Sequence, residues 1–127
     1  MKQMKTRLND ALILQAFARL GIELDFKQER NVDSALVGTM VFIEFSIQRP
    51  YRTLTLSPCD ENDTVTAFVE DGVTNRAIYN LDARCMFSID SFMDALKRQP
   101  AMLATLKGAP VVNTPIDWHN YRRKEDE

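Results

Sequence analysis

Apolar and polar residues follow three successive spacings along this chain, and each spacing predicts a different kind of element. Residues 5–20 carry apolar side chains around most of a helical circumference, and Gly21 follows where a helix C-terminal cap belongs. Residues 22–26 alternate apolar and polar side chains, which is the period of a half-buried strand. Similar alternation recurs further along, at residues 41–47, 52–57, 64–70 and 76–81.

Polar residues, proline and an Asp-Gly pair separate these predicted strands. We expect a turn or loop at 27–31 and a short strand at 32–37. Pro50 cannot donate to a sheet ladder, so it marks a turn, and residues 58–63 form an acidic loop. Asp71-Gly72 is typical of a turn between two antiparallel strands. The strands are therefore expected to be antiparallel neighbours.

The last third of the chain returns to helical spacing. Ser88 is a suitable N-cap for a helix with one apolar face, and Pro100 begins a second, shorter helix that stops at Gly108. The order of elements predicts a two-layer α+β fold, with an N-terminal helix and C-terminal helices packed on one face of an antiparallel sheet of about five strands. We expect a single domain over residues 1–108 and an extended, partly mobile C-terminal tail over 109–127.

Composition places the chain among ordinary globular proteins. Its 127 residues are 45% hydrophobic and 27% charged, and the formal net charge of −2 lacks the basic excess typical of nucleic-acid binders. Cys59 and Cys85 belong to no C-x-x-C pair, and the chain has neither a signal-peptide pattern nor an apolar run long enough for a membrane span. These features predict a cytoplasmic protein with reduced thiols.

The sequence predicts no catalytic residue, no cofactor and no metal ligand. His119 is the only histidine and has no partners at zinc-ligand spacing, and no glycine-rich phosphate loop is present. Glu44 is the one carboxylate inside an apolar stretch, so burial would make it an acid–base candidate. The alternation of residues 41–47 instead places Glu44 on the outer face of the sheet with Phe42 and Ser46, as a surface residue.

Surplus apolar surface without chemistry indicates association, so we expect a non-catalytic protein-binding module that acts as an adaptor, chaperone or inhibitor of a partner protein. The first predicted helix is apolar nearly all round and needs a second covering surface, either another subunit, which predicts a homodimer, or the interior of its own domain. Arg with aromatic residues also favours protein contact. The partner-binding candidates lie on this helix, on the outer sheet face, at the Pro50 turn and in the tail: Leu14, Phe17, Phe42, Phe68, Arg49, Tyr51, Arg52, Trp118 and Tyr121.

Two alternatives belong to other classes. One is a small-ligand-binding protein or minor enzyme with a pocket between the first helix and the sheet, into which Tyr79, Cys85 or Glu44 would point. The other is nucleic-acid binding through Arg49, Tyr51, Arg52 and the tail. The pattern "LQAFARLGIELDF" before antiparallel strands and a late helix resembles, as an architectural analogy, small acidic dimeric secretion chaperones, whose further helix between the strands has no counterpart here.

Overall fold

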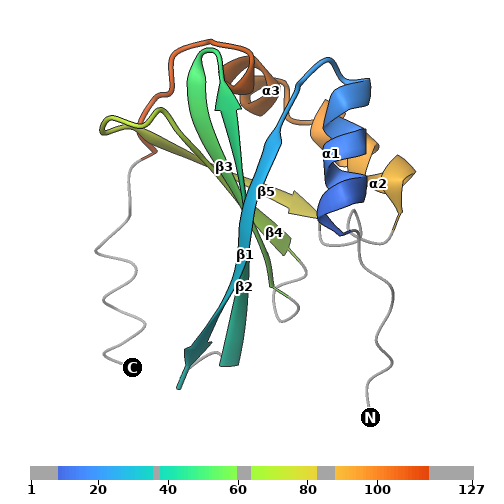
Figure 1. The fold of residues 1–127 in the computed structure, drawn as a ribbon, viewed down its shortest axis with the longest axis vertical. Coiled ribbons are helices and arrows are strands. Elements are labelled where there is room, and N and C mark those ends of the chain that lie inside the picture. The colour runs from blue at the N-terminus through green and yellow to red at the C-terminus, as the bar shows by residue number, and fades with distance from the viewer. Residues whose placement is uncertain (1–8, 36–37, 60–63, 83–87, 115–127) are drawn as a thin grey trace.

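Five strands in chain order form one antiparallel sheet, and three helices cover one of its faces (Figure 1). The computed structural model of the chain describes residues 9–35, 38–59, 64–82 and 88–114. The α+β fold predicted from the sequence is confirmed, including the number of strands and the placement of the helices. The elements are α1 Asp10–Arg19, β1 Asp25–Ser34, β2 Gly38–Gln48, β3 Tyr51–Cys59, β4 Thr64–Glu70, β5 Arg76–Asp82, α2 Ile89–Lys97 and α3 Pro100–Leu106.

The helix ends follow the local signals in the sequence. Asn9 caps α1 by accepting a hydrogen bond from the Leu12 N–H at 3.0 Å, and Gly21 ends it with a φ of 82°. The predicted beginning of this helix at residues 5–8 lies outside the described residues. The Ser88 hydroxyl caps α2 by accepting from the Ser91 N–H at 3.0 Å, and Pro100 occupies the first turn of α3.

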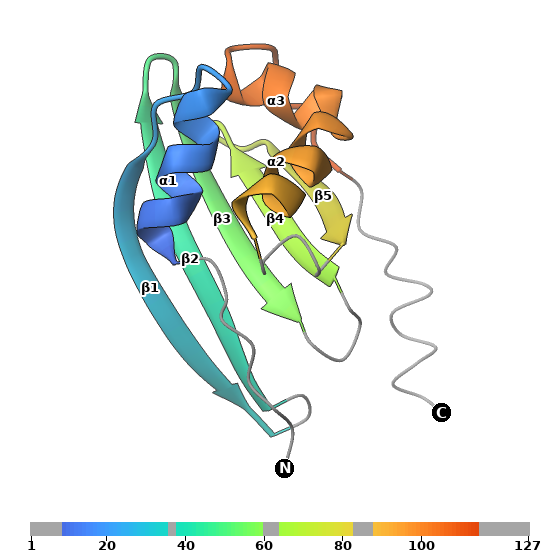
Figure 2. The ribbon, with the colours of Figure 1, turned by 90° about the vertical axis from the view of Figure 1, so that its right-hand side faces the viewer.

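Helix α1 packs against the sheet on one side and against the neighbouring helix α2 on another, and these two contacts account for its wide apolar circumference. Ile13, Ala16 and Phe17 are fully buried, and the ring of Phe17 meets the ring of Phe92 edge to face at 5.8 Å between centroids. The second covering surface that the sequence required is therefore α2 of the same domain (Figure 2).

The core fills the space between the helices and the inner face of the sheet. Buried residues recur at every second position of the inner strands, as the alternation predicted. On the sheet these residues are Ile43, Phe45, Ile47, Leu54, Leu56, Val65, Ala67, Val69, Ala77 and Leu81. The helices contribute Phe92, Leu96, Met102 and Leu106 beside the α1 residues.

Strand β1 differs most from the sequence prediction. The expected loop at 27–31 is wrong, because these residues pair with β2 inside one continuous strand, with a register irregularity between Phe26 and Gln28. The strand begins at Asp25, so the predicted strand at 22–26 starts too early. Residues 25–33 are all exposed. An edge strand whose far half extends beyond the helices needs no apolar alternation, and so the pattern missed it (Figure 2).

Strand β3 also extends further than predicted. Pro58 and Cys59 pair with Val65 and Thr64 of β4, although we expected residues 58–63 to form a loop. Residues 60–63 of that expected loop lie outside the described residues.

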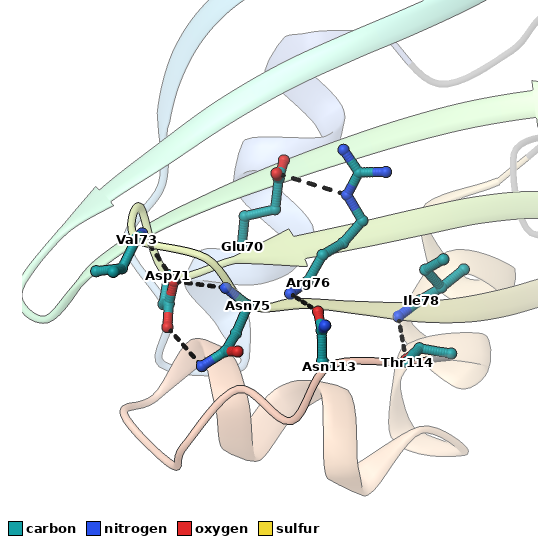
Figure 3. A network of polar contacts seen from close by, with 8 residues as sticks. All are labelled: Glu70, Asp71, Val73, Asn75, Arg76, Ile78, Asn113 and Thr114. Atoms are coloured by element: carbon teal, nitrogen blue, oxygen red, sulfur yellow. Dashed lines mark hydrogen bonds and ion pairs between the residues drawn. The ribbon is translucent and has the colours of Figure 1, made fainter. Parts of the chain in front are cut away.

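The segment after α3 runs along the free edge of β5. Val111 is buried, and Asn113 Oδ1 accepts a hydrogen bond from the Arg76 N–H at 2.9 Å. The N–H of Thr114 donates to the Arg76 carbonyl at 2.8 Å, and its hydroxyl accepts from the Ile78 N–H at 3.0 Å (Figure 3). Residues 109–114 belong to no helix or strand and are attached to the domain at the edge of the sheet.

Candidate binding surface

The outer face of the sheet, opposite the helices, is covered by no described helix (Figures 1 and 2). The cross-strand register defines which side chains share this face. Phe42, Glu44 and Ser46 of β2 lie there, as the sequence predicted. The same face also includes Gln28, Arg30, Thr53, Thr55, Ser57, Thr66, Phe68, Glu70, Arg76, Ile78 and Asn80, among others.

One end of the outer face carries an arginine stacked on a phenylalanine and bound to a glutamate. Arg30 lies opposite Phe42 in the register, with its guanidinium carbon 5.1 Å from the ring centroid. Its Nε donates to Glu44 Oε2 at 2.7 Å, and Gln28 Nε2 donates to Glu44 Oε1 at 2.8 Å. Register alone brings these four side chains together, because β1 and β2 pair along this stretch.

Glu44 is an ionised, bound carboxylate rather than an acid–base group. The side-chain hydrogen bond from Gln28 is the main cause that lowers its pKa below the ordinary value of 4.5, and Arg30 acts in the same direction. Burial opposes the shift, since only 17% of the Glu44 side chain is exposed. The face that we predicted for Glu44 is correct, while its partners come from a strand that the sequence did not indicate.

Replacing Glu44 by glutamine should lower the free energy of unfolding at neutral pH by about 0.5–1 kcal/mol, because the bond to Arg30 loses its charge. A carboxylate whose pKa is lowered by folding stabilises the native state above its unfolded pKa, and this contribution disappears as pH falls through the folded pKa. The difference between the two proteins should therefore vanish well below pH 4.5. Urea unfolding at neutral pH and at a pH well below 4.5 measures this difference in the free energy of unfolding.

The matched control is Glu23→Gln, at an exposed glutamate in the connection between α1 and β1. It should change the free energy of unfolding by less than about 0.5 kcal/mol at either pH. A loss at Glu44→Gln that is equal at neutral and acidic pH would contradict the role of the ionised carboxylate.

A second cluster of the same composition lies at the other end of the outer face. The guanidinium carbon of Arg76 is 5.4 Å from the centroid of the Phe68 ring. Its Nε is 3.5 Å from Glu70 Oε2, on the residue directly opposite in the register (Figure 3). Each cluster thus joins an arginine on an outer strand to a phenylalanine and a glutamate two residues apart on the neighbouring strand.

Hydroxyl groups fill the space between the two clusters. Thr53, Thr55, Ser57 and Thr66 point to the outer face and are half-buried. From the strand spacing and the rise per residue, Phe42 and Phe68 are about 12 Å apart across these hydroxyls. The outer face therefore offers two half-buried aromatic rings, each under a guanidinium, with hydrogen-bonding groups between them.

The two residues of α1 that we expected to bind a partner do not lie on the outer face of the sheet. Phe17 is fully buried against α2 and cannot contact a partner in the folded chain. Leu14 is half-buried and packs against the core. The two tail residues, Trp118 and Tyr121, lie outside the described residues.

The basic and aromatic residues near Pro50 do not form one surface. Arg49 is exposed, and Tyr51 is 45% exposed with its ring against Gly72. Arg52 is buried on the inner side, where its guanidinium donates to the carbonyls of three residues: Tyr51 at 2.8 Å, Thr105 at 3.1 Å and Ala109 at 3.1 Å. Arg52 therefore joins β3 to the end of α3 and is not available for binding.

A cleft of about 650 Å³ lies at the end of α1, beside the β2–β3 turn. It is lined by Gly21, Ile22, Glu23, Asp25, Ile47, Gln48, Arg49, Leu106 and Lys107. Glu44 lies on the opposite side of the sheet, Tyr79 packs against the core, and Cys85 is outside the described residues. In the described part of the chain, no buried polar side-chain atom lacks a hydrogen bond.

Among the described residues, no group of three or more His, Cys, Asp or Glu side chains could hold a metal ion. None of the described helices has the length and apolar character required to cross a membrane. No family model, no curated protein and no solved structure matches this chain.

Sequence reasoning identified Phe42 and Phe68 but missed Arg30 and Arg76, which complete the two clusters. Arg30 was hidden in an expected loop, and Arg76 is the first residue of its strand. The pairing of each strand with its neighbour would have revealed both, and periodicity within one strand does not contain that pairing.

Proposed function

We propose that this chain is a non-catalytic protein-binding module whose outer sheet face receives an amphipathic segment of a partner protein. The observation that carries the proposal is the pair of Arg–Phe–Glu clusters, separated by hydroxyl groups, on a face that no described helix covers. Aromatic and arginine side chains are the residues over-represented at the energetic centres of protein interfaces.

The spacing of the rings indicates what the partner segment looks like. Phe42 and Phe68 are about 12 Å apart, and side chains at positions i and i+4 of an extended segment are about 13 Å apart on the same side. Apolar side chains at those positions would cover both rings. A polar side chain between them would bond to the hydroxyls of Thr53, Thr55 or Thr66.

Charge favours protein over nucleic acid as the ligand. Each guanidinium of the outer face already has a carboxylate beside it, Glu44 next to Arg30 and Glu70 next to Arg76. A phosphate backbone needs uncompensated positive charge, because its affinity comes from counterion release. The burial of Arg52 removes a further cation from the alternative surface near Pro50.

The observations favour a different protein over a second copy as the partner. The apolar circumference of α1, from which we predicted a homodimer, packs in part against α2 and β1 of its own domain.

Site-specific photocrosslinking in the native host tests the proposal. A crosslinking amino acid at Thr55, in the centre of the outer face, should capture one protein, while the same group at Gln15, on the exposed side of α1, should not. With that protein purified, Phe68→Ala and Arg76→Ala should each weaken binding by about tenfold, which corresponds to about 1.4 kcal/mol.

The matched control is Val73→Ala, at an 82% exposed residue in the β4–β5 turn, which should leave the affinity unchanged. Equal capture from Thr55 and Gln15 would overturn the proposal, as would binding of nucleic acid that weakens steeply with salt. Capture of a second copy at Thr55, together with a dimeric mass in solution, would replace the separate partner by a homodimer.

A further inference from the structure

We propose that the cleft at the end of α1 binds a short zwitterionic peptide, with the peptide ammonium group beside two acidic residues and its carboxylate beside two basic residues. The acidic pair is Glu23 and Asp25, and the basic pair is Arg49 and Lys107. The cleft shares no residue with the two Arg–Phe–Glu clusters, so this would be a second binding site, separate from the proposed function.

Three segments that are far apart in the sequence meet at this cleft, at one end of the sheet (Figure 2). The connection from α1 into β1 provides Glu23 and Asp25, the β2–β3 turn provides Arg49, and the end of α3 provides Lys107. The volume of about 650 Å³ lies within the range of about 300–1,000 Å³ that is usual for small-ligand sites.

The charges that line the cleft favour a ligand with both signs of charge. Among the described residues, the four charged side chains form no ion pair and no side-chain hydrogen bond, and all four residues are exposed. A ligand with a single charge, such as a phosphate or a polyamine, would be attracted by one pair and repelled by the other. A ligand with an ammonium group at one end and a carboxylate at the other would be attracted by both. The C-terminal end of α1, next to the acidic pair, adds partial negative charge on the ammonium side.

The basic side of the cleft is built on two segments that are fixed to each other. The buried guanidinium of Arg52 donates to two backbone carbonyls around the end of α3. Pro50 also lies against Gly108, where an added Cβ would be 3.5 Å from Pro50 Cγ. The backbones that carry Arg49 and Lys107 are therefore held together in the free protein, and a ligand would not have to order them.

The last part of β2 has no strand beside it at the cleft. The pairing of β1 with β2 begins at Asp25 and Ser46, whereas β2 continues to Gln48 and there pairs only with β3. No backbone hydrogen bond between described residues joins residues 22–24 to β2. This short edge of β2 can therefore pair with the amide groups of an extended ligand, which favours a peptide over other zwitterions.

Buried apolar residues also line the cleft. Ile22, Ile47 and Leu106 are exposed by 3%, 7% and 2%, respectively. They offer an apolar contact between the acidic and the basic segments of the lining. A peptide with an apolar side chain between its two termini therefore matches the charges, the free backbone edge and the apolar contact together.

The tripeptide Ala-Leu-Ala is a suitable probe, because it has two charged termini and one apolar side chain. In heteronuclear NMR spectra it should shift the amide resonances of Gly21, Ile47 and Lys107 in a saturable manner. Titration calorimetry then gives its affinity. The N-acetylated and the C-amidated tripeptides should each bind about fivefold more weakly, because each has lost one terminal charge.

Substitutions in the cleft test which end of the peptide lies where. Glu23→Gln and Arg49→Gln, both at exposed positions, should each weaken the binding of Ala-Leu-Ala by about fivefold. Glu23→Gln should have a much smaller effect on the acetylated tripeptide, and Arg49→Gln should have a much smaller effect on the amidated one. The matched controls are Glu29→Gln and Lys97→Gln, at exposed charges outside the cleft, which should leave the affinity unchanged. Far-UV circular dichroism verifies that each variant is folded.

Several results would overturn the proposal. One is the absence of saturable shifts with Ala-Leu-Ala at millimolar concentration, and another is a set of shifts confined to residues outside the cleft. Binding that is indifferent to acetylation and amidation would exclude recognition of the two termini. Free leucine that binds as tightly as the tripeptide would exclude pairing with the edge of β2. These measurements use no partner protein, so their failure leaves the proposed function standing.

Discussion

Replacing Phe17 by alanine should lower the free energy of unfolding by about 4 kcal/mol. The side chain is fully buried, and its ring meets Phe92 edge to face at the contact between α1 and α2. Alanine would leave a cavity there, because the surrounding core relaxes only partly into the space that the ring leaves. Urea unfolding followed by far-UV circular dichroism gives the value, since the single tryptophan lies outside the described fold.

The control for Phe17→Ala is Gln15→Ala on the exposed side of the same helix, which should change stability by less than about 0.5 kcal/mol. Leu14→Ala, at a half-buried position, should fall between the two. A loss below about 1 kcal/mol at Phe17→Ala would contradict the core role and return Phe17 to the binding surface that the sequence suggested.

Phe17 also illustrates what periodicity along one element leaves open. The apolar circumference of residues 5–20 correctly indicates a helix in contact with two surfaces. It does not say which surfaces, because the second one is α2, which follows about seventy residues later in the chain. Only the packing of the three helices on the sheet decides between the same domain and another subunit.

The sheet was predictable where its strands lie between other strands and the helices. The alternation of residues 41–47 and 64–70 gave the correct faces, because the inner side of β2 and β4 packs on the core. It failed in β1, where all of residues 25–33 are exposed and charge replaces apolar alternation. Both clusters of the outer face depend on pairings such as Arg30 with Phe42, which no single strand encodes.

The sequence did contain an indication that Arg52 is buried, but a second pattern suggested that it is exposed. Arg52, Leu54 and Leu56 share one face by the period of two, and the structure places all three inside. Grouping Arg52 with Arg49 and Tyr51 as a basic and aromatic cluster suggested an exposed binding residue instead. Alternation within a strand is the stronger indication, because it follows directly from backbone geometry.

Replacing Arg52 by methionine should lower the free energy of unfolding by about 3 kcal/mol. Methionine keeps much of the buried stem, so the loss reports the guanidinium and not a cavity. Three carbonyls lose a charged donor, and two of them, those of Thr105 and Ala109, lie at and just after the C-terminal end of α3, where a cation is favourable. Urea unfolding of the variant and the original protein measures the difference.

Two further substitutions separate charge from geometry at this position. Arg52→Lys keeps the positive charge, but an ammonium group cannot donate to three carbonyls that are arranged around a planar guanidinium. This variant should therefore lose about half as much stability as Arg52→Met. Arg49→Ala, at the exposed neighbour in the turn, should cost less than about 0.5 kcal/mol. If Arg52→Met were no more destabilising than Arg49→Ala, the buried guanidinium would not be what holds α3 to β3.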